Sequence, residues 1–181
     1  MAPSTKPVQS FVREGKLDRE AVAAALKGWL GAVMPKTGMN LRCKIQTSPA
    51  SAAGDEEFER PEVVVLFDGP DVGLLLDHGA EILLALEYLS VRSLRIEPPF
   101  FDRIRFDAGD YRAARIAELK NAARVAAGRV RDSRQPFRMN PMTARERRIV
   151  HLALKDQPGI RTSSDGLGEE RQVVIYPAEN Q

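Results

Sequence analysis

The sequence predicts an α+β protein built from two modules, and three observations support this prediction. Hydrophobic residues make up 43% of the 181 positions, which is enough for a packed core. Residues 18–107 contain apolar spacings typical of helices in some segments and of strands in others. Residues 103–151 hold 13 basic and 5 acidic side chains, a net charge of +8, whereas the segment before them carries −4 and the segment after them −2. A basic stretch of this kind points to an anionic partner such as nucleic acid, although a solvated basic surface gives the same pattern.

The first module opens with a predicted helix. Residues 1–16 show no periodicity, and we expect them to be a flexible N-terminus. Asp18 is placed to cap a helix that runs to about Met34, and Pro35 and Gly38 are expected to end it. Its apolar residues recur at helical spacing and predict one buried face: Val22, Leu26, Trp29, Leu30 and Val33.

Strands and a second helical region follow. Three segments have alternating or β-branched patterns that predict strands: "LRCKI" at 41–45, "EVVVLF" at 62–67 and "RIRF" at 103–106. In the first of them, Leu41, Cys43 and Ile45 are expected to share one face. Residues 48–60 predict a long, acidic hairpin loop. A short apolar turn, Leu74–Leu76, precedes a helix expected from about Ala80 to Arg92.

The second module begins with a long helix over residues 110–132, whose alanines favour helix and whose five arginines and one lysine leave much of its surface positive. "QPFRM" predicts a short strand or extended connector. Thr143 and Glu146 fit a capping box at the start of a helix that runs to about Lys155. "TSSDGLGEE" is expected to be a flexible loop, and "RQVVIYP" a final strand.

The helix "TARERRIVHLALKD" carries one of only two histidines in the chain. At 100° per residue, its apolar side chains fall on one arc, and Arg147, Arg148, His151 and Lys155 fall on the opposite one. Arg147 and His151 are four residues apart and therefore lie side by side. Arg147 offers a bidentate fork to a phosphate, and His151 offers a hydrogen bond or a stacking surface. The alternative is that His151 is an ordinary surface histidine.

Catalysis and metal binding are not expected. A general base needs an orienting partner, and the nearest carboxylates, Glu146 and Asp156, are five residues to either side of His151, off its face. A metal site needs convergent ligands, but His78 and His151 are far apart in the chain with no cysteine beside them. We therefore expect a protein that is not an enzyme and that has no metal and no cofactor.

The cellular compartment is expected to be the cytoplasm. Cys43 is the single cysteine, so an intramolecular disulfide framework is excluded and a reducing compartment fits. The N-terminal residues show no apolar core of a signal peptide. Apolar runs are interrupted by charges before ~18 residues, so no membrane insertion is expected.

The C-terminal part of the sequence resembles a known family. "ERRIVHLAL" is similar to the R-three-H motif, an arginine followed after three residues by a histidine, here Arg147 and His151. With "MNPMTA" before it and "RQVVIYP" after it, the stretch resembles the bacterial Jag family, in which a KH domain precedes an R-three-H domain. "FDAGDYRAAR" and "GPDVGLLLDHGAEILLALEYL" extend the resemblance upstream, to about residue 61.

The resemblance implies a fold and a function. The fold is a type II KH domain of order α-β-β-α-α-β over residues 17–108, a connecting helix over 109–134 and a small α/β R-three-H domain over 135–178. The implied function is binding of single-stranded nucleic acid, RNA or DNA, and we expect RNA to be the target. The implied contact residues are Arg147 and His151, with Arg171 on the last strand as a supporting contact. We expect the neighbouring basic residues of the same helix, Arg145, Arg148 and Lys155, to contribute to binding as well.

One departure from the family concerns the KH loop. A KH domain places Gly-x-x-Gly between two helices so that its backbone can approach phosphates. The four positions here are Asp77, His78, Gly79 and Ala80, so both signature glycines are replaced and the first is now negatively charged. We expect this degenerate loop to have lost RNA binding. The alternative function is then a protein-interaction module, in which the KH domain pairs with itself or with another small KH protein and nucleic-acid binding is secondary.

Overall fold

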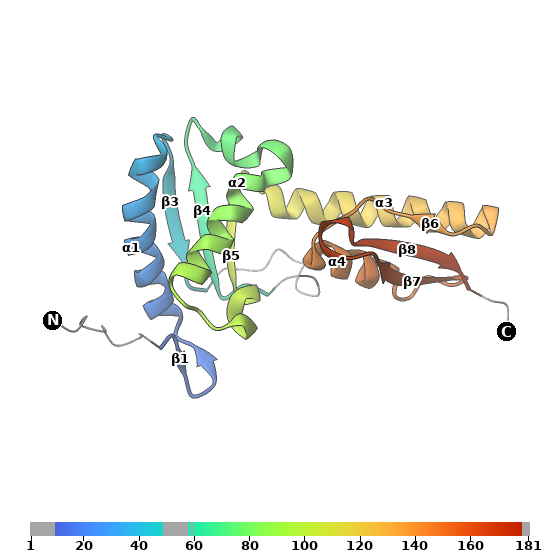
Figure 1. Ribbon diagram of the computed structural model, residues 1–181, viewed down its shortest axis with the longest axis horizontal. Coiled ribbons are helices and arrows are strands. Elements are labelled where there is room, and N and C mark those ends of the chain that lie inside the picture. The colour runs from blue at the N-terminus through green and yellow to red at the C-terminus, as the bar shows by residue number, and fades with distance from the viewer. Residues whose placement is uncertain (1–9, 49–57, 59, 179–181) are drawn as a thin grey trace. The chain divides into compact units, whose positions relative to one another are not determined.

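The computed structural model describes residues 10–48, 58 and 60–178 (Figure 1). The chain divides into two compact units. The first comprises Met1–Ser51 with Glu59–Tyr111, and the second comprises Ala52–Phe58 with Arg112–Gln181. Each unit has its own hydrophobic core.

The N-terminal segment is more ordered than its sequence predicts. Strands β1 (Val12–Arg13) and β2 (Lys16–Leu17) pair as an antiparallel hairpin. Its turn residues, Glu14 and Gly15, both have positive φ, as tight hairpin turns require. The expectation of a flexible segment is therefore wrong for residues 10–16, because Phe11 and Leu17 are buried in the first core and hold the hairpin there. Residues 1–9 lie outside the described part of the chain.

Helix α1 (Arg19–Thr37) starts where the sequence predicts. The Asp18 carboxylate accepts a hydrogen bond from the Ala21 backbone N–H at 3.1 Å. The helix passes through Pro35 and ends at Gly38, which has a left-handed conformation. Pro35 was expected to end the helix and does not, because in the last turn it removes only one hydrogen bond, and Gly38 supplies the stop.

The sheet of the first unit has the order β3-β4-β5, formed by β3 (Arg42–Gln46), β4 (Val63–Asp68) and β5 (Ile104–Ala108). The predicted hairpin is confirmed, since β3 pairs antiparallel to β4, and β5 then pairs parallel to β4. Leu41 and Ile45 pack on the core as expected, but Cys43 is exposed on this edge strand. Within the predicted hairpin loop, residues 49–57 and 59 lie outside the described residues. Phe58 is buried in the core of the second unit.

Helix α2 (Val72–Ser93) contains an interruption. The residues Asp77 to Ala80 have non-helical backbone angles and separate a short first segment from a longer second one. The short 3-10 helix η1 (Pro98–Arg103) then leads into β5. The first unit therefore has the predicted order helix, strand, strand, helix, helix, strand. One side chain departs from the pattern: Arg105, on alternating "RIRF", is buried, and its guanidinium donates to the carbonyls of Phe101 and Ile104.

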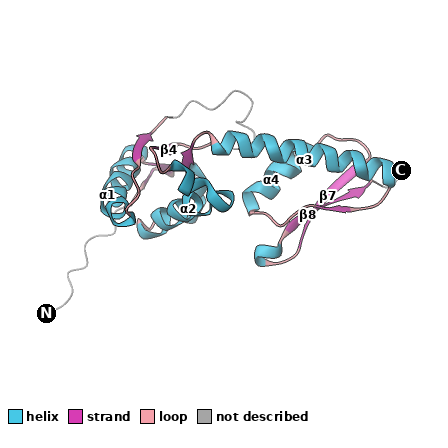
Figure 2. Ribbon diagram, turned by 90° about the horizontal axis from the view of Figure 1, so that it is seen from above, coloured by secondary structure: helices cyan, strands magenta, loops and turns pink. Residues whose placement is uncertain are grey.

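The second unit contains two helices and a three-stranded antiparallel sheet. The helices are α3 (Tyr111–Ser133), whose first residue belongs to the first unit, and α4 (Ala144–Leu154). The sheet has the order β6-β8-β7, formed by β6 (Phe137–Arg138), β7 (Ile160–Asp165) and β8 (Gln172–Pro177). Both helices pack against one face of the sheet (Figure 2). Helix α3, helix α4, β6 and β8 are where the sequence predicts them.

Strand β7 corrects the sequence-based prediction. "TSSDGLGEE" was expected to be a loop, yet its first four residues belong to β7, which pairs with β8 at six positions. The loop is shorter and consists of Gly166, Leu167 and the 3-10 helix η2 (Gly168–Glu170). The prediction failed because the side chains that β7 turns inward after Ile160 are Thr162 and Ser164, which are small and polar and do not produce an apolar alternation.

Two absences hold for the described residues. Within residues 10–48, 58 and 60–178, none of the helices combines the length and apolar character needed to cross a bilayer. The same residues contain no group of three or more His, Cys, Asp or Glu side chains placed to hold a metal ion.

Candidate nucleic-acid interface

Helix α4 is fixed in place by its first turn. The Thr143 hydroxyl accepts a hydrogen bond from the Glu146 backbone N–H, and the Glu146 carboxylate accepts one from the Thr143 backbone N–H at 2.9 Å. The predicted capping box is therefore confirmed. Glu146 also accepts a hydrogen bond from Arg115 of α3 at 2.8 Å. Burial alone would raise the pKa of Glu146, but the bonds from Thr143 and Arg115 outweigh it and lower that pKa below its ordinary value of 4.5.

His151 does not lie on an open surface. Its ring contacts two hydroxyl groups of β7: Nδ1 is 2.7 Å from Thr162 Oγ1, and Nε2 is 2.9 Å from Ser164 Oγ. The ring is half-buried. The sequence predicted that His151 lies on an exposed face of α4, but its ring packs against the inward-facing side of the edge strand β7.

The charge state of His151 follows from this position. Burial lowers the pKa of His151 below its ordinary value of 6.5, and the positive charge of Arg147 one turn away lowers it further. At neutral pH the imidazole is therefore neutral. One ring N–H donates to one hydroxyl, and the other ring nitrogen accepts from the second hydroxyl.

Arg147 lies beside His151 on α4, as the spacing predicts. It is half-buried, and its Nη1 donates to the Met142 carbonyl at 2.8 Å. The Met142 backbone N–H in turn donates to the Arg171 carbonyl at 3.1 Å. The residue that the family resemblance implies as a supporting contact, Arg171, is thus joined to Arg147 through Met142. Its side chain is exposed.

The remaining predicted residues of α4 differ in accessibility. Arg148 and Lys155 are exposed, whereas Arg145 is half-buried. Arg148 donates from Nη1 to the Phe58 carbonyl at 3.1 Å. These basic residues, with Arg147, His151 and Arg171, all belong to the second unit.

Sequence reasoning missed Thr162 and Ser164. The register pairs them with Ile175 and Val173, which are buried in the second core, so both hydroxyls face the helices. Ser163, between them, faces the other side of the sheet. The sequence held one weak signal for them: two hydroxyl residues two positions apart, which would share one face of a strand.

The opposite face of the sheet has a different chemistry. Arg161 stacks over the Tyr176 ring at 4.4 Å, and Arg138 forms an ion pair with Asp165 at 2.6 Å. Here the cations pair with a carboxylate or an aromatic ring, whereas on the face beside α4 the neutral hydroxyls contact His151.

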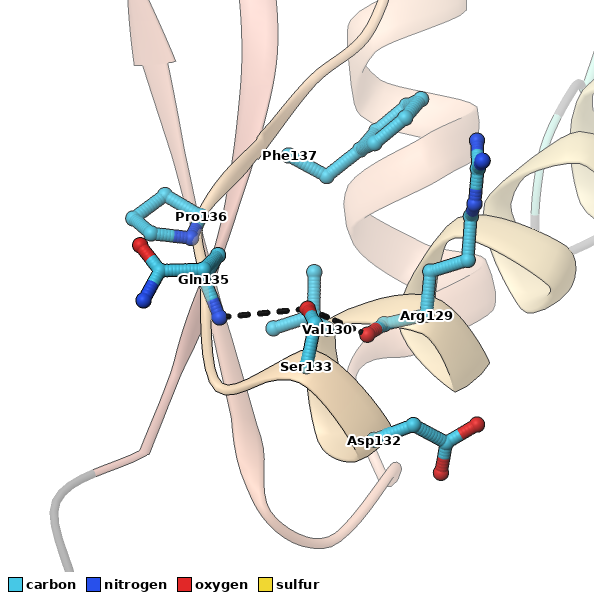
Figure 3. Close-up of a pocket in the computed structure, with 7 residues that line it drawn as sticks. All are labelled: Arg129, Val130, Asp132, Ser133, Gln135, Pro136 and Phe137. Atoms are coloured by element: carbon cyan, nitrogen blue, oxygen red, sulfur yellow. Dashed lines mark hydrogen bonds between the residues drawn. The ribbon is translucent and has the colours of Figure 1, made fainter.

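A hollow of about 560 Å³ lies at the C-terminal end of α3 (Figure 3). It is lined by seven residues: Arg129, Val130, Asp132, Ser133, Gln135, Pro136 and Phe137. The Ser133 hydroxyl bridges its two sides by donating to the Arg129 carbonyl and accepting from the Gln135 backbone N–H. The hollow contains none of the residues that the sequence assigns to binding, so it is separate from the α4 surface.

The degenerate loop of the first unit is strained. His78, Gly79 and Ala80 all have positive φ, and only Gly79 adopts such angles without steric cost. Asp77, His78 and Gly79 are exposed, while Ala80 is buried. The Gly79 carbonyl accepts a hydrogen bond from the Tyr111 hydroxyl at 2.8 Å. Ala80, predicted as the first helical residue, is instead the last residue of the chain reversal.

These features define a class of protein. Residues 117–177 match the R-three-H domain family, and this range contains the whole of α4, β7 and β8. The R-three-H motif suggested by Arg147 and His151 is therefore confirmed as part of such a domain.

Similar proteins define the family. The chain is 32% identical to the RNA-binding protein KhpB of Bacillus subtilis, over 93% of this chain and 91% of that protein. It is 31% identical to the RNA-binding protein KhpB of Clostridium symbiosum, over 63% of this chain and 51% of that protein. Against KhpB of Lactiplantibacillus plantarum the identity is 26%, over 86% of this chain and 45% of that protein. The chain belongs to the KhpB, or Jag, family. It spans nearly the whole Bacillus relative and about half of the other two.

Proposed function

We propose that the protein binds single-stranded RNA through the surface formed by α4 and β7 of its R-three-H domain. The observation that carries the proposal is the placement of Arg147 and His151 on one face of α4, inside the matched domain and against a strand of hydroxyl residues. The relatives' name, RNA-binding protein, supports RNA as the nucleic acid.

The charges support phosphate contact at this surface. An arginine carries five N–H donors, and Arg147 uses one of them, at Nη1, on the Met142 carbonyl. The bond holds the guanidinium in place, so less side-chain entropy is lost when the remaining donors meet a phosphate. Arg148, Lys155 and Arg171 are exposed and provide further positive charge. Within the described part of the chain, His151 contacts two hydroxyls and no carboxylate that would orient it as a base, so the proposal includes no catalytic step.

The decisive experiment compares two arginine variants. Arg147→Ala should weaken binding of a fluorescent single-stranded RNA pool by about tenfold, which corresponds to ~1.4 kcal/mol. Arg42→Ala is the matched control, because it removes the same charge from an exposed ion pair in the first unit. Equal affinity of both variants and the parent would contradict the proposal.

We further propose that residues 17–108 form a type II KH domain, that 109–134 form a connecting helix, whose part from residue 117 is included in the R-three-H match, and that 135–178 form the rest of the R-three-H domain. The element order and the mixed sheet of the first unit support this assignment. The loop at Asp77 to Ala80 occupies the place of the phosphate-binding loop. Its negative charge argues that this domain does not bind RNA there.

A second function, protein interaction through the first unit, is favoured by a separate observation. Helix α2 exposes four large hydrophobic side chains, each more than two-fifths exposed: Leu74, Ile82, Tyr88 and Leu89. Ile82 and Leu89 are seven residues apart and lie on one face of the helix. Self-association, or pairing with a small KH protein, would cover this face.

Sedimentation of the parent and of Ile82→Glu with Leu89→Glu tests the second function. A dimer that the double variant abolishes supports self-association. A parent that is monomeric alone, and remains so with a small KH protein added, contradicts it. The absorbance ratio at 260 and 280 nm, before and after a high-salt wash, shows whether nucleic acid accompanies either form.

A further inference from the structure

The hydrogen bonds of the His151 cluster can be counted. The cluster consists of the His151 imidazole and the hydroxyls of Thr162 and Ser164. A neutral imidazole has one donor and one acceptor, and each hydroxyl has one donor and two acceptor sites. Both ring nitrogens are occupied by hydroxyls, so the ring has no remaining hydrogen-bonding group in its plane.

The count fixes what the two hydroxyls can offer to a ligand. The hydroxyl that accepts from the ring N–H keeps its own O–H donor. The hydroxyl that donates to the ring keeps only acceptor sites. This result is the same for either tautomer, because exchanging the two ring nitrogens only exchanges Thr162 and Ser164. The cluster therefore presents one hydroxyl that can donate beside one that can only accept.

This pair does not suit a phosphate. Phosphate oxygens only accept hydrogen bonds. A phosphate oxygen could accept from the donating hydroxyl, but the lone pairs of the second hydroxyl would repel it. A ribose 2′-hydroxyl both donates and accepts, and it can bond to the two hydroxyls together. Deoxyribose has no hydroxyl at the 2′ position and cannot make either bond.

We propose that Thr162 and Ser164 contact a ribose 2′-hydroxyl and make the α4 surface prefer RNA to DNA, with His151 as the residue that orients them. The proposal rests on the proposed function and adds the group that is recognised. Arg147, one turn from His151, then meets the neighbouring phosphate. The two residues of the motif thus have different roles, since Arg147 contacts the backbone and His151 acts through the strand.

The test uses matched oligonucleotide pools of about twelve random nucleotides, a length suited to single-strand sites. One pool is RNA, one is DNA with uracil in place of thymine, and one is 2′-O-methyl RNA, which keeps the oxygen but cannot donate. Fluorescence anisotropy gives the affinity of the full chain for each. The parent should prefer RNA to both other pools by about three- to tenfold, as expected for one or two hydrogen bonds.

Thr162→Val with Ser164→Ala should remove this preference. RNA affinity should fall to the level of DNA affinity, while DNA affinity should stay within about twofold of the parent. Ser163→Ala is the control, because it removes a hydroxyl from the opposite face of the same strand and should leave the preference intact. Two single variants separate loss of the contact from loss of the fold. Ser164→Ala should reduce the preference for RNA. Thr162→Ser keeps the hydroxyl and should preserve the preference.

Each other outcome overturns the proposal in a recognisable way. A parent that binds the RNA and DNA pools equally contradicts 2′-hydroxyl recognition and leaves the proposed function intact. Equal losses for RNA and DNA in the double variant would assign the hydroxyls to phosphate contact or to folding. A parent that binds none of the pools contradicts the proposed function itself.

The ratio of RNA to DNA affinity should also depend on pH. When His151 is protonated, both ring nitrogens donate and both hydroxyls become free to donate to a phosphate. The preference for RNA should therefore fall as the pH drops below the pKa of His151, which burial and Arg147 place under 6.5. The β7 groups that face the ring are uncharged. A His78→Gln background leaves His151 as the only histidine, so its titration can be followed by NMR, and a ratio that stays constant through that titration would contradict the orienting role.

Discussion

The two units differ at the places where each is expected to meet nucleic acid. In the first, the reversal between the halves of α2 exposes Asp77 and His78 on a strained backbone. In the second, Arg147 is held by the Met142 carbonyl, and His151, one turn further along α4, is held by two hydroxyls of β7. In the proposed KH domain, phosphate binding would depend on close approach of the backbone, and the replacement of both glycines and the charge of Asp77 would obstruct it. The second depends on side chains, which remain in place.

The difference suggests how binding can persist in such a chain. A backbone site fails when a single position acquires a side chain or a charge, because the approach to the phosphate is then blocked. A side-chain site distributes its contacts over a helix and a strand. The following four predictions test this contrast, from the largest expected effect to the smallest.

Salt should weaken binding strongly if the basic residues of the second unit neutralise phosphates. For single strands, the logarithm of the affinity falls with the logarithm of salt concentration by ~0.7 per phosphate contacted. With about four phosphates, affinity should fall about 50-fold between 50 and 200 mM salt. Titration of the RNA pool at several salt concentrations measures the slope. Arg147→Ala should reduce the slope, and a flat dependence in the parent would mean that the basic residues form only a solvated surface.

Removal of Glu146 should destabilise the second unit alone. Glu146→Ala breaks the capping box and leaves Arg115 without one of its two carboxylates, which should cost about 2 kcal/mol of unfolding free energy. Glu118→Ala is the control: this side chain also pairs with Arg115 but is exposed, so its loss should cost less than about 0.5 kcal/mol.

Two probes distinguish the units in this experiment. The single tryptophan, Trp29, lies in the first unit, so its fluorescence reports on that unit, while circular dichroism reports on the helices of both. The urea transition should shift in circular dichroism and stay unchanged in fluorescence. Equal shifts in both probes would mean that the units unfold together.

Stability of the second unit should fall at mildly acidic pH. The folded pKa of His151 lies below its ordinary value of 6.5, so the unfolded chain takes up a proton at higher pH than the folded chain. The contribution is complete above pH 6.5 and is lost as the pH falls through the folded pKa. Glu146, whose pKa lies below 4.5, adds a second loss at lower pH. Thermal melts of the parent and of His151→Gln measure this, and identical slopes between pH 7 and 5 would contradict it.

Repair of the degenerate loop should have the smallest effect. Asp77→Gly removes a charge which, at ~6 Å in water, repels a phosphate by roughly 0.7 kcal/mol, so RNA affinity should rise by up to about threefold. Glu97→Ala, at an exposed carboxylate elsewhere in the first unit, is the control. Ala80→Gly should change stability little, because relief of the positive φ, about 1 kcal/mol, is offset by loss of a buried methyl of similar value. An affinity gain above tenfold from Asp77→Gly would mean that the first unit is a nucleic-acid site that this one charge suppresses.

Local sequence was sufficient for most elements. Asp18 and Gly38 set the ends of α1, and Thr143 and Glu146 set the start of α4, because caps act within a few residues of the chain. Alanine-rich composition identified α3, and alternating or β-branched patterns identified the strands β3, β4 and β5. Such patterns failed for β1 and β2, which are two residues each, and for β7, whose inward side chains include Thr162 and Ser164.

The sequence alone predicted only part of the candidate site. The four-residue spacing of Arg147 and His151 determines that they lie together on one face of α4, because the helical repeat is a local property. Tertiary structure alone decided what covers that face. Pairing of β7 with β8 brings Thr162 and Ser164 to the two nitrogens of His151, and this depends on strand register between residues distant in the chain. Ala80 shows the same limit. Alanine favours helix, yet Ala80 has a positive φ in the reversal between the halves of α2. Packing of the two halves outweighs the intrinsic preference, which is about 1 kcal/mol.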